Sequence, residues 1–335
     1  MKILCLSSLA GPGLDALREM GDLELDPWNA TPSIRLHPPD ELLARMGGVE
    51  VLIVEADRVG SEVIEGAGAL RVIGATRGDP VNIDLDAATS RGIPVLIAPG
   101  RNADAVAELT LGLIIAVTRG IVASDADVRA SRWATEEGIA QRRYWARELS
   151  SLTIGLVGAG QVGRAVARRL VALGSRVVAY DPYADGGALR DVGIELLGLD
   201  EMLAASDVVS IHALVTDETK GMIGEAEIAK MKPGAYLVNS ARYAIVDEEP
   251  MLEALRSGHL AGAAFDHFEG EFLPPGHPLV TMPNVVLTPH IGGSTDETVI
   301  NHTTAMAEGL RTLLDGGSPP NVANPGALAA FQAAR

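Results

Sequence analysis

Short apolar segments alternate with amphipathic segments along almost the whole chain, and this alternation constrains the fold more than any other feature. In the first hundred residues we predict strands at Lys2–Leu6, Val51–Val54, Arg71–Ala75 and Pro94–Ile97, with helical segments near 11–20, 39–46, 60–67 and 83–90 between them. Strands that alternate with helices are typical of βαβ units, which form a parallel sheet covered by helices. The chain is therefore predicted to be an α/β protein.

A second series of strands follows a long predicted helix at Ala103–Thr118. Its members are Leu152–Val157, Arg176–Tyr180, Asp207–Ile211, Ala235–Val238, Ala261–Phe265 and Asn284–Leu287. Six strands with intervening helices make a complete doubly wound sheet. A long helix at Ser294–Leu314 then returns the chain. We predict two domains: a Rossmann-type domain at 102–295, and a smaller flavodoxin-like α/β domain made of 1–101 and 296–335.

Composition excludes several classes of function. The 335 residues carry a net charge of −17, which disfavours nucleic acid or an anionic membrane as the main partner. Cys5 is the only cysteine, so an internal disulfide is impossible, and its apolar neighbours indicate a core position. The N-terminal apolar run breaks at Gly11-Pro12-Gly13, which suits a strand and turn better than a signal peptide. We expect a cytoplasmic protein.

A glycine-rich turn lies between the first strand of the second series and the helix after it. Gly158, Gly160 and Gly163 form a GxGxxG pattern, which is weak alone but here follows an apolar strand and opens an amphipathic helix. In such a turn the N–H groups around Gln161-Val162 bind a pyrophosphate at the positive helix end. The alternative is a nucleotide-free α/β domain with a Gly-rich turn.

Asp181 ends the next predicted strand, eighteen residues beyond Gly163. A carboxylate at this place accepts hydrogen bonds from the ribose hydroxyls of adenosine and repels a 2′-phosphate. The alternative is a helix-capping aspartate. With strand, helix and acid in register, we predict a dinucleotide site that prefers NAD to NADP.

Polar residues end the other strands of this series as well: His212, Arg242, Asp266 and His290. Ligands of doubly wound sheets bind beyond the carboxyl ends of the strands. Hydride transfer from an alcohol needs a base for the hydroxyl proton and a cation for an acidic substrate, and His290 and Arg242 could supply them. Glu269 or Glu271 could hold the His290 imidazole. For His212 we favour a structural role.

The chain resembles the D-isomer-specific 2-hydroxyacid dehydrogenase family, which contains phosphoglycerate dehydrogenases. The matching stretches are RGIPVLIAPGRNADAVAE, IGLVGAGQVG, VSIHALVTDET, MKPGAYLVNSARYAIVDEE, LAGAAFDHFEGE, HPL and NVVLTPHIGGST, in the order of the family. The resemblance implies an NAD-dependent enzyme that interconverts a D-2-hydroxy acid and its 2-keto acid. A corepressor-like NAD(H)-sensing protein is the alternative, because the family includes such proteins.

The resemblance also implies roles for individual residues. Arg242, Glu271 and His290 match the catalytic Arg–Glu–His set of the family. Asp266 matches a contact to the nicotinamide carboxamide. The cofactor cleft would further include Ala213, Thr219, Ala241, Gly292 and Gly293.

The sequence departs from the family pattern around the substrate. The substrate loop reads Thr76-Arg77-Gly78-Asp79-Pro80-Val81-Asn82, where a Gly-x-Gly type is common. Arg77, Gly78, Asp79 and, on a facing loop, Arg101 are the candidate substrate-binding residues. The two arginines suggest a second anionic group, such as phosphate or phosphonate, although either could instead bind a neighbouring carboxylate such as Asp79 or Asp104. Tyr243 replaces the usual glycine after the catalytic arginine, and its bulk could reshape the pocket or close against the other domain.

Three further expectations concern the rest of the chain. The remaining histidines, His37, His259, His267, His277 and His302, show no metal-ligand spacing and are interpreted as loop or surface residues, although His267 lies in the catalytic stretch. The segment Val122–Arg147, with Trp133, Tyr144 and Trp145, corresponds to the part through which the family usually dimerises, so a homodimer is expected; these aromatics could equally be local core. No C-terminal regulatory domain is expected after the returning helix.

Overall fold

The computed structural model describes residues 1–31, 33–132, 134–135 and 138–334. The chain forms two compact units: the first is Met1–Asn102 with Thr295–Arg335, and the second is Ala103–Ser294. Each unit has its own parallel sheet, and the predicted α/β class is confirmed.

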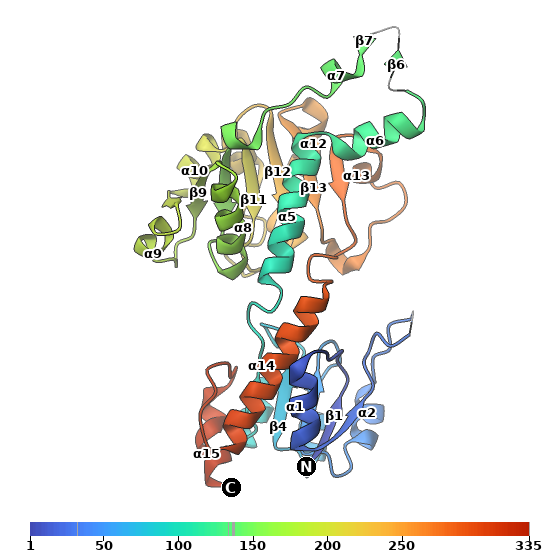
Figure 1. Cartoon of the computed structure of the whole chain (residues 1–335), viewed down its shortest axis with the longest axis vertical. Helices are drawn as coiled ribbons and strands as arrows, with labels where there is room; N and C mark the ends of the chain where they lie inside the picture. Colours follow the sequence, from blue (N-terminus) through green and yellow to red (C-terminus); the bar gives the residue numbers. More distant parts are fainter. Residues whose placement is uncertain (32, 133, 136–137, 335) are drawn as a thin grey trace. The chain divides into compact units, whose positions relative to one another are not determined.

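The sheet of the first unit has five parallel strands in the order β2-β1-β3-β4-β5, which is the flavodoxin-like order. The strands are β1 (Lys2–Cys5), β2 (Asp22–Leu25), β3 (Val51–Val54), β4 (Val72–Ala75) and β5 (Val95–Leu96). The helices are α1 (Pro12–Met20), α2 (Pro39–Arg45), α3 (Ser61–Gly66), α4 (Leu85–Ser90), α14 (Asp296–Leu314) and α15 (Leu328–Ala333), with a 3₁₀ turn η4 (Pro325–Ala327). Figure 1 shows α1 and α14 side by side, with both chain termini in this unit.

The sheet of the second unit has seven parallel strands in the order β10-β9-β8-β11-β12-β13-β14. These are β8 (Thr153–Val157), β9 (Arg176–Tyr180), β10 (Ile194–Leu196), β11 (Val208–Ile211), β12 (Ala235–Asn239), β13 (Leu260–Phe265) and β14 (Val285–Leu287). The helices are α5 (Ala103–Thr118), α6 (Ile121–Arg129), α7 (Ala140–Arg143), α8 (Gln161–Ala172), α9 (Gly186–Arg190), α10 (Leu199–Ala205), α11 (Glu225–Lys230), α12 (Glu248–Ser257) and α13 (Pro278–Thr281). Short 3₁₀ turns lie at η1 (Leu149–Ser151), η2 (Tyr243–Ile245) and η3 (Glu269–Glu271), and β6 (Ala134–Thr135) pairs with β7 (Gly138–Ile139). The strand order reverses between β8 and β11, where doubly wound sheets bind ligands.

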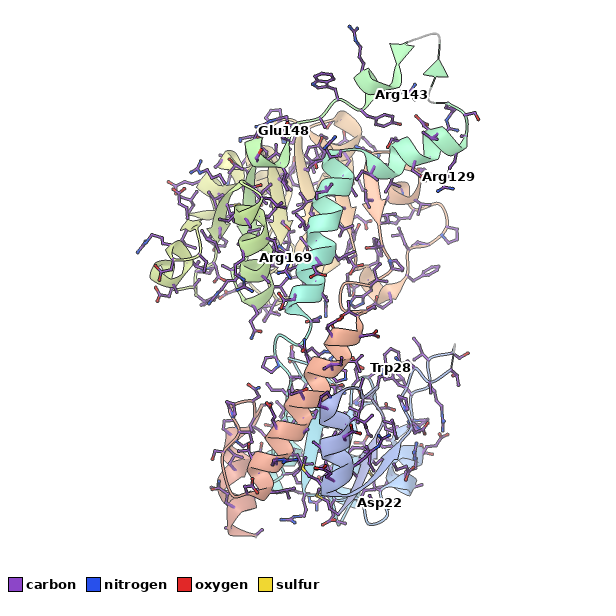
Figure 2. All side chains as sticks on the ribbon, viewed as in Figure 1. Asp22, Trp28, Arg129, Arg143, Glu148 and Arg169 are labelled. Carbon is purple, nitrogen blue, oxygen red and sulfur yellow. The ribbon has the colours of Figure 1, made fainter. Side chains whose placement is uncertain are left out.

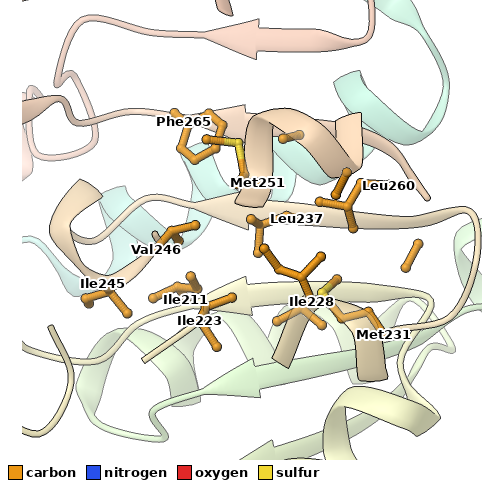
Figure 3. Close-up of a cluster of buried hydrophobic side chains, with 14 of the residues drawn as sticks. Ile211, Ile223, Ile228, Met231, Leu237, Ile245, Val246, Met251, Leu260 and Phe265 are labelled. Atoms are coloured by element: carbon orange, nitrogen blue, oxygen red, sulfur yellow. The ribbon is translucent and has the colours of Figure 1, made fainter. Parts of the chain in front are cut away.

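Successive residues of the central strands fill two separate cores, because side chains alternate across a strand. Leu237 and Phe265 point to the face covered by α10, α11 and α12, where Figure 3 shows them with Ile228 and Met251. Their neighbour Val238 points to the other face, covered by α5 and α8. Both faces of this sheet are therefore buried, which explains why its strands are almost continuously apolar.

The structure corrects the number of strands. The second sheet has seven strands rather than the predicted six, because β10 was missed, and β2 was missed in the first sheet. Both are short edge strands, and β2 (DLEL) is largely exposed. Edge strands need little apolar surface, so hydrophobic patterning does not reveal them.

Cys5 lies buried in β1, as its neighbours predicted, and burial raises the pKa of its thiol to about 12. In the described part of the chain, no single helix is long and apolar enough to cross a membrane. The helices Ala103–Thr118 and Ile121–Arg129, which meet at a bend, are together long and apolar enough by length and composition alone.

Candidate active site

The turn between β8 and α8 has the geometry of a phosphate-binding turn. Gly158 has a φ of 95°, and a Cβ there would lie 2.8 Å from the backbone nitrogen of Ala213. A Cβ at Gly163 would collide with the carbonyl oxygen of Gly158, whereas one at Gly160 would meet nothing within 4 Å. Gly158 and Gly163 thus allow close packing, and Gly160 faces open space. These are the glycine roles that a pyrophosphate-binding turn requires.

The N-terminus of α8 fits the same ligand. Gly160 is the N-cap residue and has no side chain to accept a hydrogen bond from the first turn. The N–H groups of Gln161, Val162 and Gly163 at the start of this helix therefore point toward the open side of the turn. An anion is stabilised there by the helix dipole and by these donors.

Asp181 follows β9 and is held by two backbone donors. Its Oδ2 accepts a hydrogen bond from the Ala159 N–H at 2.8 Å, and its Oδ1 accepts one from the Tyr183 N–H at 2.9 Å. Each carboxylate oxygen can accept a second hydrogen bond. Asp181 is thus fixed beside the glycine-rich turn with acceptor capacity left for the hydroxyls of a ribose.

The loop after β11 lies next to the glycine-rich turn after β8, because β8 and β11 are neighbouring strands. The Nδ1 of His212 is buried, and its Nε2 lies 2.9 Å from the Ser210 hydroxyl. Burial lowers the pKa of His212 to about 4, so this imidazole is neutral near pH 7. Thr219 closes the loop after Ala213, since its hydroxyl accepts from the Thr216 N–H at 2.8 Å and donates to the Leu214 carbonyl.

His290 and Glu271 are in direct contact. The His290 Nδ1 lies 2.8 Å from the Glu271 Oε1. An imidazole that donates from Nδ1 to a carboxylate keeps its Nε2 for another partner. Both residues have positive φ angles, 55° for His290 and 56° for Glu271, which are uncommon for residues other than glycine.

Asp266 holds the loop that carries His290. It is buried at the end of β13, its Oδ1 accepts from the Thr288 hydroxyl at 2.6 Å and the Ile291 N–H at 2.9 Å, and its Oδ2 accepts from the Gly292 N–H at 2.8 Å. A Cβ at Gly292 would lie 2.9 Å from this Oδ2. Three donors leave one acceptor position on the Asp266 carboxylate. Gly293 is the next residue of the same loop.

Arg242 and Tyr243 follow β12. The Arg242 side chain is exposed, and its guanidinium donates to the Ala241 carbonyl at 3.0 Å. The Tyr243 ring is buried against Phe265 and Phe268, with ring centroids 5.5 and 5.8 Å apart. Its hydroxyl donates to Glu248 at 2.8 Å. Tyr243 therefore packs into the core of the second unit, which differs from the expectation that its bulk reshapes a pocket.

The first unit has a polar cluster at the carboxyl ends of its own strands. Glu55, just after β3, lies 2.6 Å from the Arg101 guanidinium and accepts from the Trp28 indole N–H at 3.0 Å. Arg101 also lies 2.7 Å from the Nδ1 of His302, whose Nε2 contacts the Ser8 carbonyl at 2.7 Å. Arg101 is thus paired with a neighbouring carboxylate, as one of the two alternatives held, but this carboxylate is Glu55.

The carboxylate of Asp104 belongs to a different contact, because it pairs at 3.0 Å with Arg169 of α8, labelled in Figure 2. In the loop after β4, the Arg77 carbonyl accepts from the Ala98 N–H at 2.8 Å, while Gly78 and Asp79 are exposed.

Two histidines that were interpreted as loop or surface residues are buried. His302 lies inside α14 with 1% of its surface exposed, and His37 with 6% contacts the buried Asp57 at 2.9 Å. The sequence alone does not show whether a polar residue has a buried hydrogen-bond partner. The prediction that His37 and His302 are loop or surface residues is therefore wrong.

The profile of the D-isomer specific 2-hydroxyacid dehydrogenase NAD-binding domain matches residues 111–292 of this chain. That is more than half of the 335 residues and covers the glycine turn, Asp181, Glu271 and His290. The chain belongs to this family. The second unit is accordingly the NAD-binding domain of a D-2-hydroxyacid dehydrogenase family member, and NAD is its cofactor.

Curated relatives of two kinds are similar to this family member. A D-3-phosphoglycerate dehydrogenase of Archaeoglobus fulgidus is 36% identical over 97% of this chain and 59% of its own length. The chain thus spans about three fifths of that relative. A glyoxylate reductase of Thermofilum pendens is 38% identical over 96% of this chain and 94% of its own length.

Solved structures agree with this family assignment. The TT0316 protein from Thermus thermophilus aligns with a TM-score of 0.83 and 39% identity, covering 96% of this chain and all of its own. A D-lactate dehydrogenase from Aquifex aeolicus, complexed with NAD and lactic acid, aligns with a TM-score of 0.74 and 26% identity over 94% of this chain and 96% of its own.

Glu55 and His302 are the candidate functional residues of the first unit that sequence reasoning missed. Glu55 directly follows a buried apolar strand. The rule that ligands bind beyond the carboxyl ends of parallel strands points to it in the first sheet as it does to Arg242 in the second. His302 gave no such signal, because it lies in the middle of a long helix.

Proposed function

We propose that this family member is an NAD-dependent oxidoreductase that interconverts a D-2-hydroxy acid and its 2-keto acid. The observation that carries the proposal is the 2.8 Å contact between His290 Nδ1 and Glu271 Oε1, in the same unit as the NAD-binding turn. A histidine fixed at Nδ1 by a carboxylate presents Nε2 as a general acid or base.

NAD, when bound, supplies or accepts the hydride of this reaction. In the reduction, His290 Nε2 donates a proton to the carbonyl oxygen of the substrate, and in the oxidation it removes the hydroxyl proton. Glu271 keeps Nδ1 protonated and the ring oriented. Arg242, whose side chain is exposed at the end of β12, binds the substrate carboxylate through its guanidinium.

The proposed cofactor contacts follow from the donors and acceptors described above. The N–H groups of Gln161, Val162 and Gly163 bind the pyrophosphate, and Asp181 binds the adenosine ribose. The remaining acceptor position on Asp266 takes the amide N–H of the nicotinamide carboxamide. Ala213, Thr219, Ala241, Gly292 and Gly293 belong to loops that follow the carboxyl ends of β11, β12 and β14 and are proposed to line the cofactor cleft.

The substrate is proposed to be a small anionic acid, selected in part by Arg77, Gly78, Asp79 and Arg101. Glu55 offsets the positive charge of Arg101 at 2.6 Å, so this arginine is a weaker candidate for binding a second anion than the sequence had suggested. The full-length match to glyoxylate reductases also supports a small acid without phosphate. A phosphorylated or phosphonate substrate is the alternative.

A panel of keto acids tests the proposal. NADH oxidation is followed by fluorescence with glyoxylate, pyruvate and the 2-keto acid of D-3-phosphoglycerate, and the D and L hydroxy acids are then compared in the reverse direction. Turnover of at least one keto acid, with the D isomer alone oxidised, is the expected result. NADH binding without turnover on any would overturn the proposal and favour the corepressor-like sensor.

We further propose that the protein acts in the cytoplasm as a homodimer. Support for the dimer comes from α6 and the segment after it, where Ile121, Val122, Val128 and Trp145 are each between 48% and 85% exposed. Exposed apolar side chains that gather on one element indicate a protein contact surface. Trp133 of the same segment lies outside the described residues.

A further inference from the structure

His267, which the sequence places in the same stretch as the predicted catalytic residues, lies next to the His290–Glu271 pair. It follows Asp266 at the end of β13, and its side chain is 13% exposed. Its Nε2 lies 3.5 Å from the Glu271 Oε1, which is the same oxygen that contacts His290. The two imidazole rings meet edge to face, with centroids 5.0 Å apart. One carboxylate oxygen therefore faces two histidines.

The backbone of Tyr243 determines which nitrogen of His267 carries the proton. The Tyr243 N–H donates to the His267 Nδ1, with 3.4 Å between the nitrogens. A nitrogen that accepts a hydrogen bond carries no proton, so the proton of the neutral ring is on Nε2. This nitrogen lies 3.5 Å from the Glu271 Oε1.

The charges around His267 favour this neutral ring. Burial lowers the pKa of His267, and the nearby charges of Arg242 and His290 lower it further, while Glu271 and Glu269 act in the opposite direction. The net shift is downward, so the imidazole is neutral near pH 7.

Glu271 needs such a support because its own surroundings hold it weakly. Its side chain is 56% exposed, and it follows Gly270, whose φ is 64°. An exposed carboxylate on a loop exchanges rotamers readily. Tyr243, by contrast, is fixed in the core by Phe265, Phe268 and Glu248. Two successive contacts, from the Tyr243 N–H to His267 and from His267 to Glu271, thus connect Glu271 to a rigid part of the unit.

We propose that His267 is a positioning residue that donates from Nε2 to Glu271 Oε1 and so holds the carboxylate against His290. The inference rests on the proposed oxidoreductase function. It also assigns a role to Tyr243: the buried ring fixes the backbone N–H that selects the His267 tautomer.

A divalent metal ion is the other use that these three side chains suggest, since their ligand atoms lie within 4.8 Å of one another. A histidine that binds a metal usually donates its other ring N–H to an acceptor. The Nδ1 of His267 instead faces a donor, the Tyr243 N–H. This arrangement leaves the proton on the nitrogen that would have to bind the metal, and it favours the hydrogen bond to Glu271.

Two substitutions separate positioning from packing. His267→Phe keeps an aromatic ring but removes both nitrogens, and His267→Gln restores an N–H donor. His259→Phe is the matched control, because His259 is a partly buried histidine of the same unit that contacts the Ile228 carbonyl. Circular dichroism and NADH binding are measured first to show that each variant folds.

Steady-state rates are then measured from pH 5.5 to 9. We expect His267→Phe to lower kcat for reduction about 10- to 100-fold, the size of loss that a misplaced catalytic group causes, with the KM for NADH unchanged. His267→Gln should recover much of the rate, and His259→Phe should match the wild type.

The ¹⁵N resonances of the wild-type imidazoles give a readout that does not depend on turnover. The Nε2–H tautomer of His267 at pH 7 is the expected result. An Nδ1–H tautomer, or a His267→Phe variant with the wild-type rate and pH profile, would overturn the inference. Absence of turnover in the wild type itself would overturn the proposed function, and the tautomer would still decide the inference.

Discussion

At the scale of single residues, backbone strain collects at the proposed catalytic pair. Among the described residues other than glycine, positive φ angles occur at Ser131, Glu271 and His290. Each such residue costs on the order of 1–3 kcal/mol and persists where the surroundings hold it in place. Asp266 provides that hold for the His290 loop, through hydrogen bonds from Ile291 and Gly292. Local strain thus supports the placement of the pair in the active site.

His302 makes the stability of the chain depend on pH. Burial lowers the pKa of His302, the Arg101 charge lowers it further, and the contacts with Ser8 and Glu55 oppose these effects without reversing them. The unfolded chain therefore binds a proton more readily than the folded chain. The resulting stability is complete above the unfolded value of about 6.5 and is lost as the pH falls through the folded value.

Urea unfolding at pH 7.5 and pH 5.0 checks this dependence. The wild type should lose stability at pH 5.0, since a protonated His302 would lie beside Arg101. His302→Gln should lose clearly less between the two values, and His259→Gln should behave as the wild type. An equal loss in His302→Gln and the wild type would contradict the account.

At the scale of elements, the central strands were predictable and the edges were not. The strands around β8, β11, β12 and β13 bury both faces, so their apolar runs identify them, and the residues at their carboxyl ends identify the site. The exposed edge strands β2 and β10 carry no such pattern.

Contacts between loop side chains were also beyond prediction. The approach of His267 to Glu271, and of Arg101 to Glu55, depends on the backbone path of each loop. The types of the individual loop residues do not determine that backbone path. The sequence therefore indicated which residues carry the chemistry but not how they are held.

The α6 helix supports a prediction about assembly. Ile121 and Val128 lie seven residues apart and hence on one helix face, and both are about half exposed. If this face is the dimer contact, Val128→Asp should shift the protein from dimer to monomer in sedimentation velocity, because an unpaired charge would be buried. Val280→Asp, at an equally exposed valine of α13, should leave the dimer intact. A wild-type monomer, or a dimer unaffected by Val128→Asp, would contradict the proposal.

At the scale of the whole molecule, the two units have different sheet orders and distinct proposed roles. The order of the seven-stranded sheet places the glycine turn after β8 next to the loop after β11, at the strand-order reversal. The order of the five-stranded sheet gathers Glu55 and Arg101 at the carboxyl ends of its strands. In both sheets the candidate site residues therefore lie beyond the carboxyl ends of the parallel strands.

The central claim is that His290 exchanges the substrate proton in an NAD-dependent reaction, and His290→Ala tests it most directly. The measurement is kcat for NADH oxidation with the keto acid that the wild type reduces fastest, after NADH binding has been shown to be unchanged. A general acid contributes about 10²- to 10⁴-fold, so a loss of that size is the predicted result. Near-normal turnover of His290→Ala would contradict the account.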